Sequence, residues 1–192
     1  IIMVRGDNRG LVLPPRVAPI QVVIIPIAQN KEGVLDKAYE IKKELEAKGI
    51  KVKLDDDTNY SPGWKFNQYE MKGVPLRLEI GPRDIENNVT MIARRDTLSK
   101  DSYSLDNIGE TVKNLLDTVH NDMLEKARNH RDSKTFTFND YEDFKKKMKE
   151  TPGFAKGMWC GEESCEEKIK EETGITIRCI PFVQENLGDV CQ

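Results

Sequence analysis

Hydrophobic and polar positions alternate in the sequence LRLEI near the middle of the chain. Because strand side chains point to opposite faces in turn, Leu76, Leu78 and Ile80 should face a core, while Arg77 and Glu79 share the other face. An Arg and a Glu side by side make a small polar platform, and such groups can bind the edges of unstacked bases. The same pattern more commonly indicates a solvated sheet face with cross-strand ion pairs.

The periodicity of the rest of the chain predicts further strands and helices. Strands are predicted at residues 21–27, 51–55, 76–80 and 89–95, and helices at 34–48, 64–72 and 105–123. The first 15 residues suggest a strand (IIMV), a turn and a second extended piece. The order strand–helix–strand–helix–strand–strand–helix indicates an α/β fold, a mixed sheet with helices on both faces.

A second, small α/β unit is expected after about Arg131. FTFNDYEDFKKKMKE predicts a helix capped by Asn139, with Glu142 three residues on. GFAKGMW predicts a strand, EESCEEKIKEETG a helix that ends at Gly174, and ITIRCIPF a returning strand. We therefore expect three parts, at residues 1–16, 17–132 and 133–192.

Composition limits the function classes. The chain is 38% hydrophobic and 33% charged, as in a globular protein, and its net charge of -3 gives no overall field that attracts nucleic acid. Any RNA binding should therefore be local, and no DNA binding or membrane association is expected. GxxxxGK[ST] and GxGxxG are absent, and His120 and His130 fall on different faces of one predicted helix. By itself the chain should be catalytically silent.

The four cysteines lie in the last 33 residues, at 160, 165, 179 and 191. Their clustering in one small unit favours a metal, and thiolates with tetrahedral geometry suit zinc. The spacing is less specific than paired CxxC motifs, so ordinary reduced thiols remain the alternative.

Three segments carry a family resemblance: NYSPGWKFNQYEMKGVPLRLEIGPRD, the upstream GDNRGLVLPPRVAPIQVVIIPI and the later WCGxxxC pattern. Together they resemble class II prolyl-tRNA synthetases of the archaeal and eukaryotic type, from Ile2 to the end of the chain. The resemblance implies that residues 17–132 form an anticodon-binding domain and that 133–192 form a zinc-binding-like C-terminal domain. Residues 1–16 would be a remnant of the catalytic domain, with Arg5 where similar enzymes usually have His.

The resemblance also implies particular anticodon contacts. Proline anticodons carry two invariant guanines, which need carboxylate acceptors for N1 and N2 hydrogens and Arg or Lys donors for O6 and N7. The matching positions are Glu70, Arg77, Arg83 and Asp84, with Arg95 and Lys100 as weaker candidates for a phosphate or a base. Trp64 and Phe66 could stack on a base, although a core position is the commoner role at such spacing.

In similar enzymes, the small C-terminal domain uses a CxxxxC pair and a second close pair near its end. Cys160 and Cys165 match the first pair and Cys191 one member of the second, whereas Cys179 would be a core residue. A fourth ligand would then fall just beyond Gln192, and the C-terminal Tyr of the family would also be missing, so we expect a truncated chain.

The function implied is the C-terminal part of a cytoplasmic, ATP-dependent proline–tRNA ligase. Its partners would be proline tRNA, proline and ATP, with ATP and magnesium bound only by the catalytic domain, which lies mostly upstream of Ile1. The full enzyme is expected to be a homodimer. The alternative is a freestanding α/β module that binds RNA or protein without aminoacylation, but such a module has no use for the partial catalytic segment GDNRGLVLPP.

Overall fold

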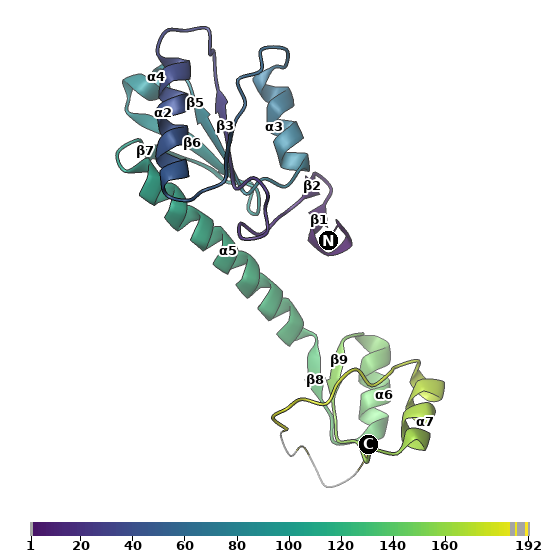
Figure 1. The fold of residues 1–192 in the computed structure, drawn as a ribbon. Helices are drawn as coiled ribbons and strands as arrows, with labels where there is room; N and C mark the ends of the chain where they lie inside the picture. Colours follow the sequence, from purple (N-terminus) through teal and green to yellow (C-terminus); the bar gives the residue numbers. More distant parts are fainter. Residues whose placement is uncertain (1, 185–186, 188–190, 192) are drawn as a thin grey trace. The chain divides into compact units, whose positions relative to one another are not determined.

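The computed structural model describes residues 2–184, 187 and 191 of the 192-residue chain (Figure 1). It comprises two compact units, which we call the larger unit (Ile1–Glu125) and the smaller unit (Lys126–Gln192). The division falls within helix α5 (Ile108–Ser133). The boundary predicted from the sequence, at 132/133, lies near the end of this helix.

A five-stranded mixed sheet forms the centre of the larger unit, in the order β4-β3-β5-β6-β7. Its strands are β3 (Val22–Pro26), β4 (Val52–Leu54), β5 (Leu76–Ile80), β6 (Val89–Arg94) and β7 (Lys100–Ser104). β3, β4 and β5 are parallel, while β6 and β7 continue the sheet in antiparallel fashion. The predicted mixed α/β fold is confirmed, but β7 was not predicted, because its sequence KDSYS lacks alternating apolar residues.

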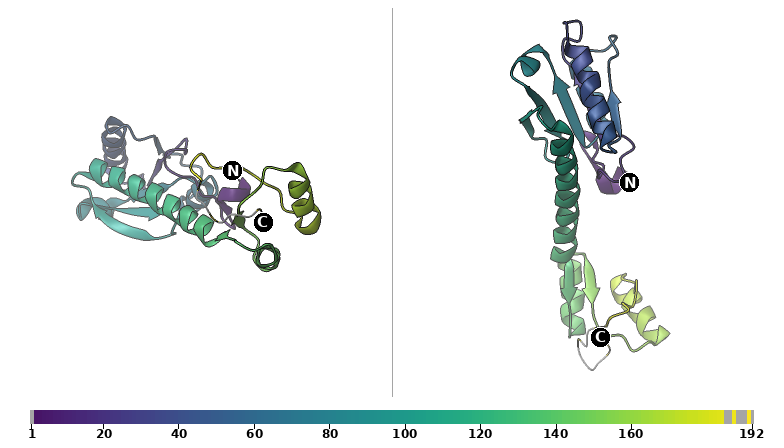
Figure 2. Two further views of the ribbon diagram at one scale, coloured as in Figure 1. Left: turned by 90° about the horizontal axis from the view of Figure 1, so that it is seen from below. Right: turned by 60° about the vertical axis from the view of Figure 1, so that its left-hand side comes forward.

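Helices cover both faces of this sheet (Figures 1 and 2). α2 (Val34–Ala47) and the first part of α5 pack on one face, where the apolar side chains of alternate strand positions are fully buried. α3 (Pro62–Met71) lies on the opposite face and buries Tyr69 against Val23 and Ile25 of β3. The predicted alternation of β5 is confirmed, since Leu76, Leu78 and Ile80 all lie in the α2/α5 core.

The N-terminal segment differs from its predicted form. Ile2, Met3 and Val4 belong to a single helical turn, α1 (Ile2–Arg5), and not to a strand. β1 (Gly6–Asp7) and β2 (Gly10–Leu11) follow as a short antiparallel pair. Gly10 has a φ of 127° and lies so close to α3 that a Cβ there would be 2.5 Å from the Cα of Met71. The hairpin is therefore seated directly on the C-terminal end of α3.

Two further elements of the larger unit differ from the predictions. The Gly-Pro-Arg-Asp turn is extended into a short helix, α4 (Pro82–Glu86), because Asp84 accepts a hydrogen bond from the Gly81 N–H at 2.8 Å and caps it. α5 continues to Ser133, well past the predicted end at 123. At the start of α3, Ser61 is the N-cap and Pro62 occupies the first helical position, and both residue types are favoured at these positions.

The smaller unit contains two parallel strands, β8 (Thr135–Thr137) and β9 (Phe154–Lys156), and two helices, α6 (Tyr141–Glu150) and α7 (Glu163–Thr173). Phe138, Phe144 and Met148 form its core. The helix cap is Asp140 and not the predicted Asn139, since the Asp140 carboxylate accepts from the Asp143 N–H at 2.9 Å.

The predicted strand ITIRCIPF does not form. Its residues run irregularly and pair with no strand of the described chain, and only Ile175 among them packs on the small core. Cys179 is accordingly exposed, and its predicted core position is wrong. Among the described residues, none of the helices combines the length and apolar character needed to cross a membrane.

Candidate functional site

A row of side chains crosses the sheet face that carries α3. The strand register places Arg77 of β5 opposite Ala93 of β6, and Ala93 opposite Lys100 of β7. Between the two cations lies Glu79, whose Oε1 accepts from Arg77 Nε at 3.1 Å and whose Oε2 accepts from Lys100 Nζ at 2.8 Å. We call Arg77, Glu79 and Lys100 the platform.

Glu79 organises the platform, although it was not among the predicted site residues. Its side chain is 7% exposed, whereas those of Arg77 and Lys100 are 18% and 42% exposed. Because one buried carboxylate holds both cations, they keep fixed positions while their other N–H groups remain available for acceptors. The alternation of LRLEI had already placed Glu79 beside Arg77, so the signal was present in the sequence.

The platform continues onto α3. The guanidinium carbon of Arg77 lies 4.2 Å from the centre of the Phe66 ring, an arrangement that fixes the plane of the guanidinium. Phe66 is itself partly buried against the α3 core, as predicted. Glu70 lies one helical turn after Phe66 and therefore on the same side of α3.

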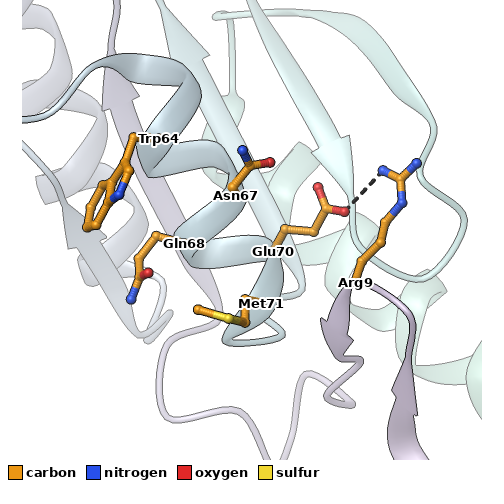
Figure 3. A pocket seen from close by; sticks show the side chains of 6 residues that line it. All are labelled: Arg9, Trp64, Asn67, Gln68, Glu70 and Met71. Atoms are coloured by element: carbon orange, nitrogen blue, oxygen red, sulfur yellow. Dashed lines mark hydrogen bonds and ion pairs between the residues drawn. The ribbon is translucent and has the colours of Figure 1, made fainter.

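Glu70 forms an ion pair with Arg9 of the N-terminal segment, 61 residues away in sequence (Figure 3). The Arg9 Nη1 to Glu70 Oε1 distance is 3.1 Å, and the side chains are 59% and 17% exposed. Nothing in the sequence pointed to Arg9. Of the predicted residues, Glu70, Arg77 and Lys100 lie on one side of the sheet, a carboxylate and two cations.

Arg83 and Asp84 lie on α4, directly after the carboxyl end of β5. The carboxylate of Asp84 is engaged in capping α4, whereas the side chain of Arg83 is exposed. Arg83 is therefore the one of the two that presents its charge to solvent.

Arg95 has a different environment. Its side chain is 3% exposed and donates to both carboxylate oxygens of Asp7, at 2.8 and 2.6 Å, and to the backbone carbonyl of Glu70 at 2.9 Å. The Arg95 hydrogen bond lowers the pKa of Asp7 well below its usual range. The guanidinium of Arg95 thus ties the N-terminal hairpin to the end of α3 and holds Glu70 in place.

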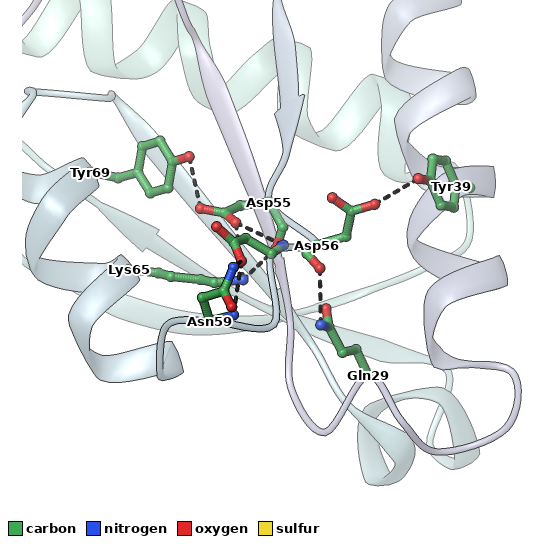
Figure 4. A network of polar contacts seen from close by, with 8 residues as sticks. Gln29, Tyr39, Asp55, Asp56, Asn59, Lys65 and Tyr69 are labelled. Atoms are coloured by element: carbon green, nitrogen blue, oxygen red, sulfur yellow. Dashed lines mark hydrogen bonds and ion pairs between the residues drawn. The ribbon is translucent and has the colours of Figure 1, made fainter.

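A second polar network fixes the other end of α3 (Figure 4). Lys65, which is 3% exposed, donates to the Asp55 carbonyl at 2.8 Å and pairs with the Asp55 carboxylate at 3.0 Å, and the Tyr69 hydroxyl donates to the same carboxylate at 2.9 Å. Burial and this hydrogen bond raise the pKa of Tyr69. Since Asp55 follows β4, the network anchors α3 to the sheet through Lys65 and Tyr69.

Three cysteines come together in the smaller unit. The Sγ atoms of Cys160, Cys165 and Cys191 all lie within 4.8 Å of one another, and those of Cys160 and Cys165 are 3.4 Å apart. A hydrogen bond from the backbone of Glu162 lowers the pKa of Cys160, and the contact with Cys160 raises the pKa of Cys165 to about 11. Such spacing allows three thiolates to bind one metal ion.

Comparison with protein families gives two matches. Residues 21–115 match the family described as "Anticodon binding domain", and residues 141–192 match "Prolyl-tRNA synthetase, C-terminal". The first match contains the platform and α3, and the second contains the cysteine cluster.

Individual proteins match over the whole chain. The chain is 90% identical over 192 residues to a proline–tRNA ligase of Acetoanaerobium sticklandii and 61% identical over 191 residues to that of Alkaliphilus oremlandii. It spans 40% of the length of each of these relatives. Among solved structures, a prolyl-tRNA synthetase from Cryptosporidium parvum, complexed with L-proline and AMP, superposes with a TM-score of 0.88 at 36% identity, over 99% of this chain and 41% of that one.

Proposed function

We propose that this chain, which belongs to the prolyl-tRNA synthetase family as the C-terminal anticodon-binding region, recognises the anticodon of proline tRNA. It would do so as part of an enzyme that attaches proline to tRNA. The observation that carries this proposal is the platform beside Glu70. One carboxylate and two fixed cations on the same side of the sheet provide the groups that a guanine needs.

The chemistry of guanine divides these groups into two roles. The N1 and N2 hydrogens of guanine are donors, and Glu70 supplies the acceptor; O6 and N7 are acceptors, and Arg77 and Lys100 supply the donors. The Arg9 ion pair uses Oε1 of Glu70, so that Oε2 can accept from a base without loss of that pair. Arg83 would add an exposed cation for a phosphate.

Two of the predicted residues, Asp84 and Arg95, hold the elements that carry the site. Asp84 keeps α4, and with it Arg83, in position, and Arg95 holds the end of α3 that carries Glu70. We therefore assign both as positioning residues of the anticodon site.

The experiment is binding of the chain to proline tRNA. Arg77→Ala and Glu70→Ala should each weaken binding by about 1–3 kcal/mol, the cost of one lost base contact. Lys113, an exposed residue of α5, provides a control, because Lys113→Ala removes a charge from a helix that packs on the opposite face of the sheet. Equal affinity of the wild type and both site variants would contradict the anticodon assignment and favour a freestanding binding module.

In the smaller unit, we propose that zinc is the ion bound by Cys160, Cys165 and Cys191. Thiolates are the ligands that zinc prefers in structural sites, and so small a core benefits from a metal. A tetrahedral ion would take a fourth ligand in addition to these three.

The chemical steps of the reaction belong to the part of the longer relatives that this chain does not span. We propose that proline, ATP and magnesium bind there, in line with the proline and AMP of the Cryptosporidium structure, and that the complete enzyme is a cytoplasmic homodimer. The described residues contribute tRNA recognition and contain no proposed catalytic group.

A further inference from the structure

Two aromatic side chains at the start of α3 are exposed in spite of their size. Tyr60 and Trp64 are 47% and 44% exposed, and their rings are stacked with centroids 3.9 Å apart and planes inclined by 13°. The expected core position of Trp64 is therefore wrong. Large aromatic groups gain free energy from burial, so an exposed, already stacked pair indicates a surface that binds a partner.

Trp64 also lines a cavity of about 440 Å³ on the outer side of α3 (Figure 3). The other lining residues are Arg9, Asn67, Gln68, Glu70 and Met71. An aromatic ring is thus combined with two side-chain amides, an ion pair and one thioether. The amides of Asn67 and Gln68 carry both donors and acceptors, so they can pair with the edge of any base.

We propose that Trp64 and this cavity form a second RNA subsite, which holds one unpaired nucleotide of the anticodon loop next to the guanines at Glu70, Arg77 and Lys100. The inference rests on the proposed function. The main support is that the two sites are continuous. Glu70 belongs both to the cavity and to the guanine site, so RNA bound at one reaches the other. A base on Trp64 would extend the stack begun by Tyr60, and such stacking tolerates any base.

The remaining residues of the cavity suit a nucleotide. Arg9 is 59% exposed and can contact a phosphate while it remains near Glu70. The indole plane is preset by Tyr60, so little conformational freedom is lost when a base stacks on it.

Trp64 can be changed without loss of the fold. It lies in neither core of the larger unit, and α3 is held by Tyr69 and by the Lys65–Asp55 pair. Trp64→Ala should therefore leave the unfolding transition of this unit unchanged, which separates a binding role from a structural one.

The test uses an RNA stem-loop with the proline anticodon, in which 2-aminopurine replaces each unpaired loop position outside the guanines in turn. The protein is the chain with Trp159→Phe, so that Trp64 is its single tryptophan. At one position, we expect 2-aminopurine fluorescence to be quenched on binding. Trp64→Ala should abolish that quenching and weaken binding by roughly 5- to 100-fold, which corresponds to about 1–3 kcal/mol for one stacked base.

Three controls make the outcomes distinct. Trp64→Phe should retain most of the affinity, and Leu124→Ala, which removes a 41% exposed apolar side chain from α5, should change nothing. The guanine preference should persist in Trp64→Ala, because the guanines are read elsewhere. If the wild type prefers guanines but Trp64→Ala binds equally well with the same quenching, the subsite is refuted and the proposed function stands. If the wild type shows no guanine preference, both fail.

Discussion

Replacement of Arg95 by Met distinguishes a positioning residue from a base contact. The substitution removes three hydrogen bonds, two to the Asp7 carboxylate and one to the Glu70 carbonyl, while it keeps much of the volume of the buried side chain. If Arg95 positions α3, this variant should lose stability, and its preference for guanine should fall only as far as Glu70 is displaced. If Arg95 instead contacts a base, the preference for guanine should be lost while stability is kept.

The expected loss of stability follows from the exposure of each partner. Asp7 is 43% exposed and is rehydrated when Arg95 is removed, so this ion pair contributes about 1 kcal/mol or less. The Glu70 carbonyl loses its side-chain donor but keeps the Gly73 N–H at 3.0 Å, so this loss costs about 0.5–1.5 kcal/mol. The total is about 0.5–2.5 kcal/mol. Asp7→Asn should cost less, about 1 kcal/mol or below, because Arg95 keeps the Glu70 carbonyl and the amide oxygen can accept one bond.

The assay is urea unfolding of the larger unit, followed by the fluorescence of Trp64 in a Trp159→Phe background. A reporter within one unit is required, because a chain of two units need not unfold in a single transition. The ratio of affinities for the guanine-containing and guanine-substituted stem-loops is measured in parallel. An unchanged unfolding midpoint together with a lost guanine preference would refute the positioning role.

Three more predictions concern the buried network and the metal. Lys65→Met should destabilise the larger unit by about 3–5 kcal/mol in urea unfolding, because it leaves the Asp55 carboxylate, 12% exposed, without its cation; a variant as stable as the wild type would contradict this. Burial tends to raise the pKa of Asp55, but the hydrogen bonds from Lys65 and Tyr69 outweigh burial and lower it, so the stabilisation is complete above the unfolded-state pKa of about 3.9 and is lost as the pH falls below it. Asp55→Asn should therefore show a shallower loss of stability between pH 5 and pH 2 than the wild type, and parallel curves would rule out this linkage. Cys160→Ser should lower zinc content measured by mass spectrometry and remove the effect of a chelator on the melting of the smaller unit, whereas Cys179→Ser should do neither; equal zinc in both variants would count against the cluster.

The fold was predictable where periodicity and packing agree. The alternation of β5 correctly assigned its two faces, because a one-residue shift would place Leu78 on the polar side. ITIRCIPF carries a similar alternation, but among the described residues it pairs with no strand, and the segment is irregular. Conversely, β7 is held by its pairing with β6 despite a polar sequence. Tertiary partners, which a local pattern does not contain, decided both cases.

The candidate site was likewise predictable only in part. The positions of Arg77 and Glu79 follow from neighbouring residues on one strand, and the family resemblance supplied Glu70 and Lys100. The ion pairs of Arg9 with Glu70 and of Arg95 with Asp7 join residues 61 and 88 positions apart, so no local pattern could have predicted them. For the same reason the buried role of Arg95 and the exposed stack of Trp64 became visible only in the structure.

The most direct test of the central claim is the affinity of this chain for proline tRNA, compared with the same tRNA whose anticodon guanines are replaced. The arrangement of Glu70, Arg77 and Lys100 predicts that replacement of one guanine weakens binding by about 1–3 kcal/mol, and that Arg77→Ala removes most of this difference. Equal affinity for both tRNAs would contradict the claim that this face of the sheet reads the anticodon.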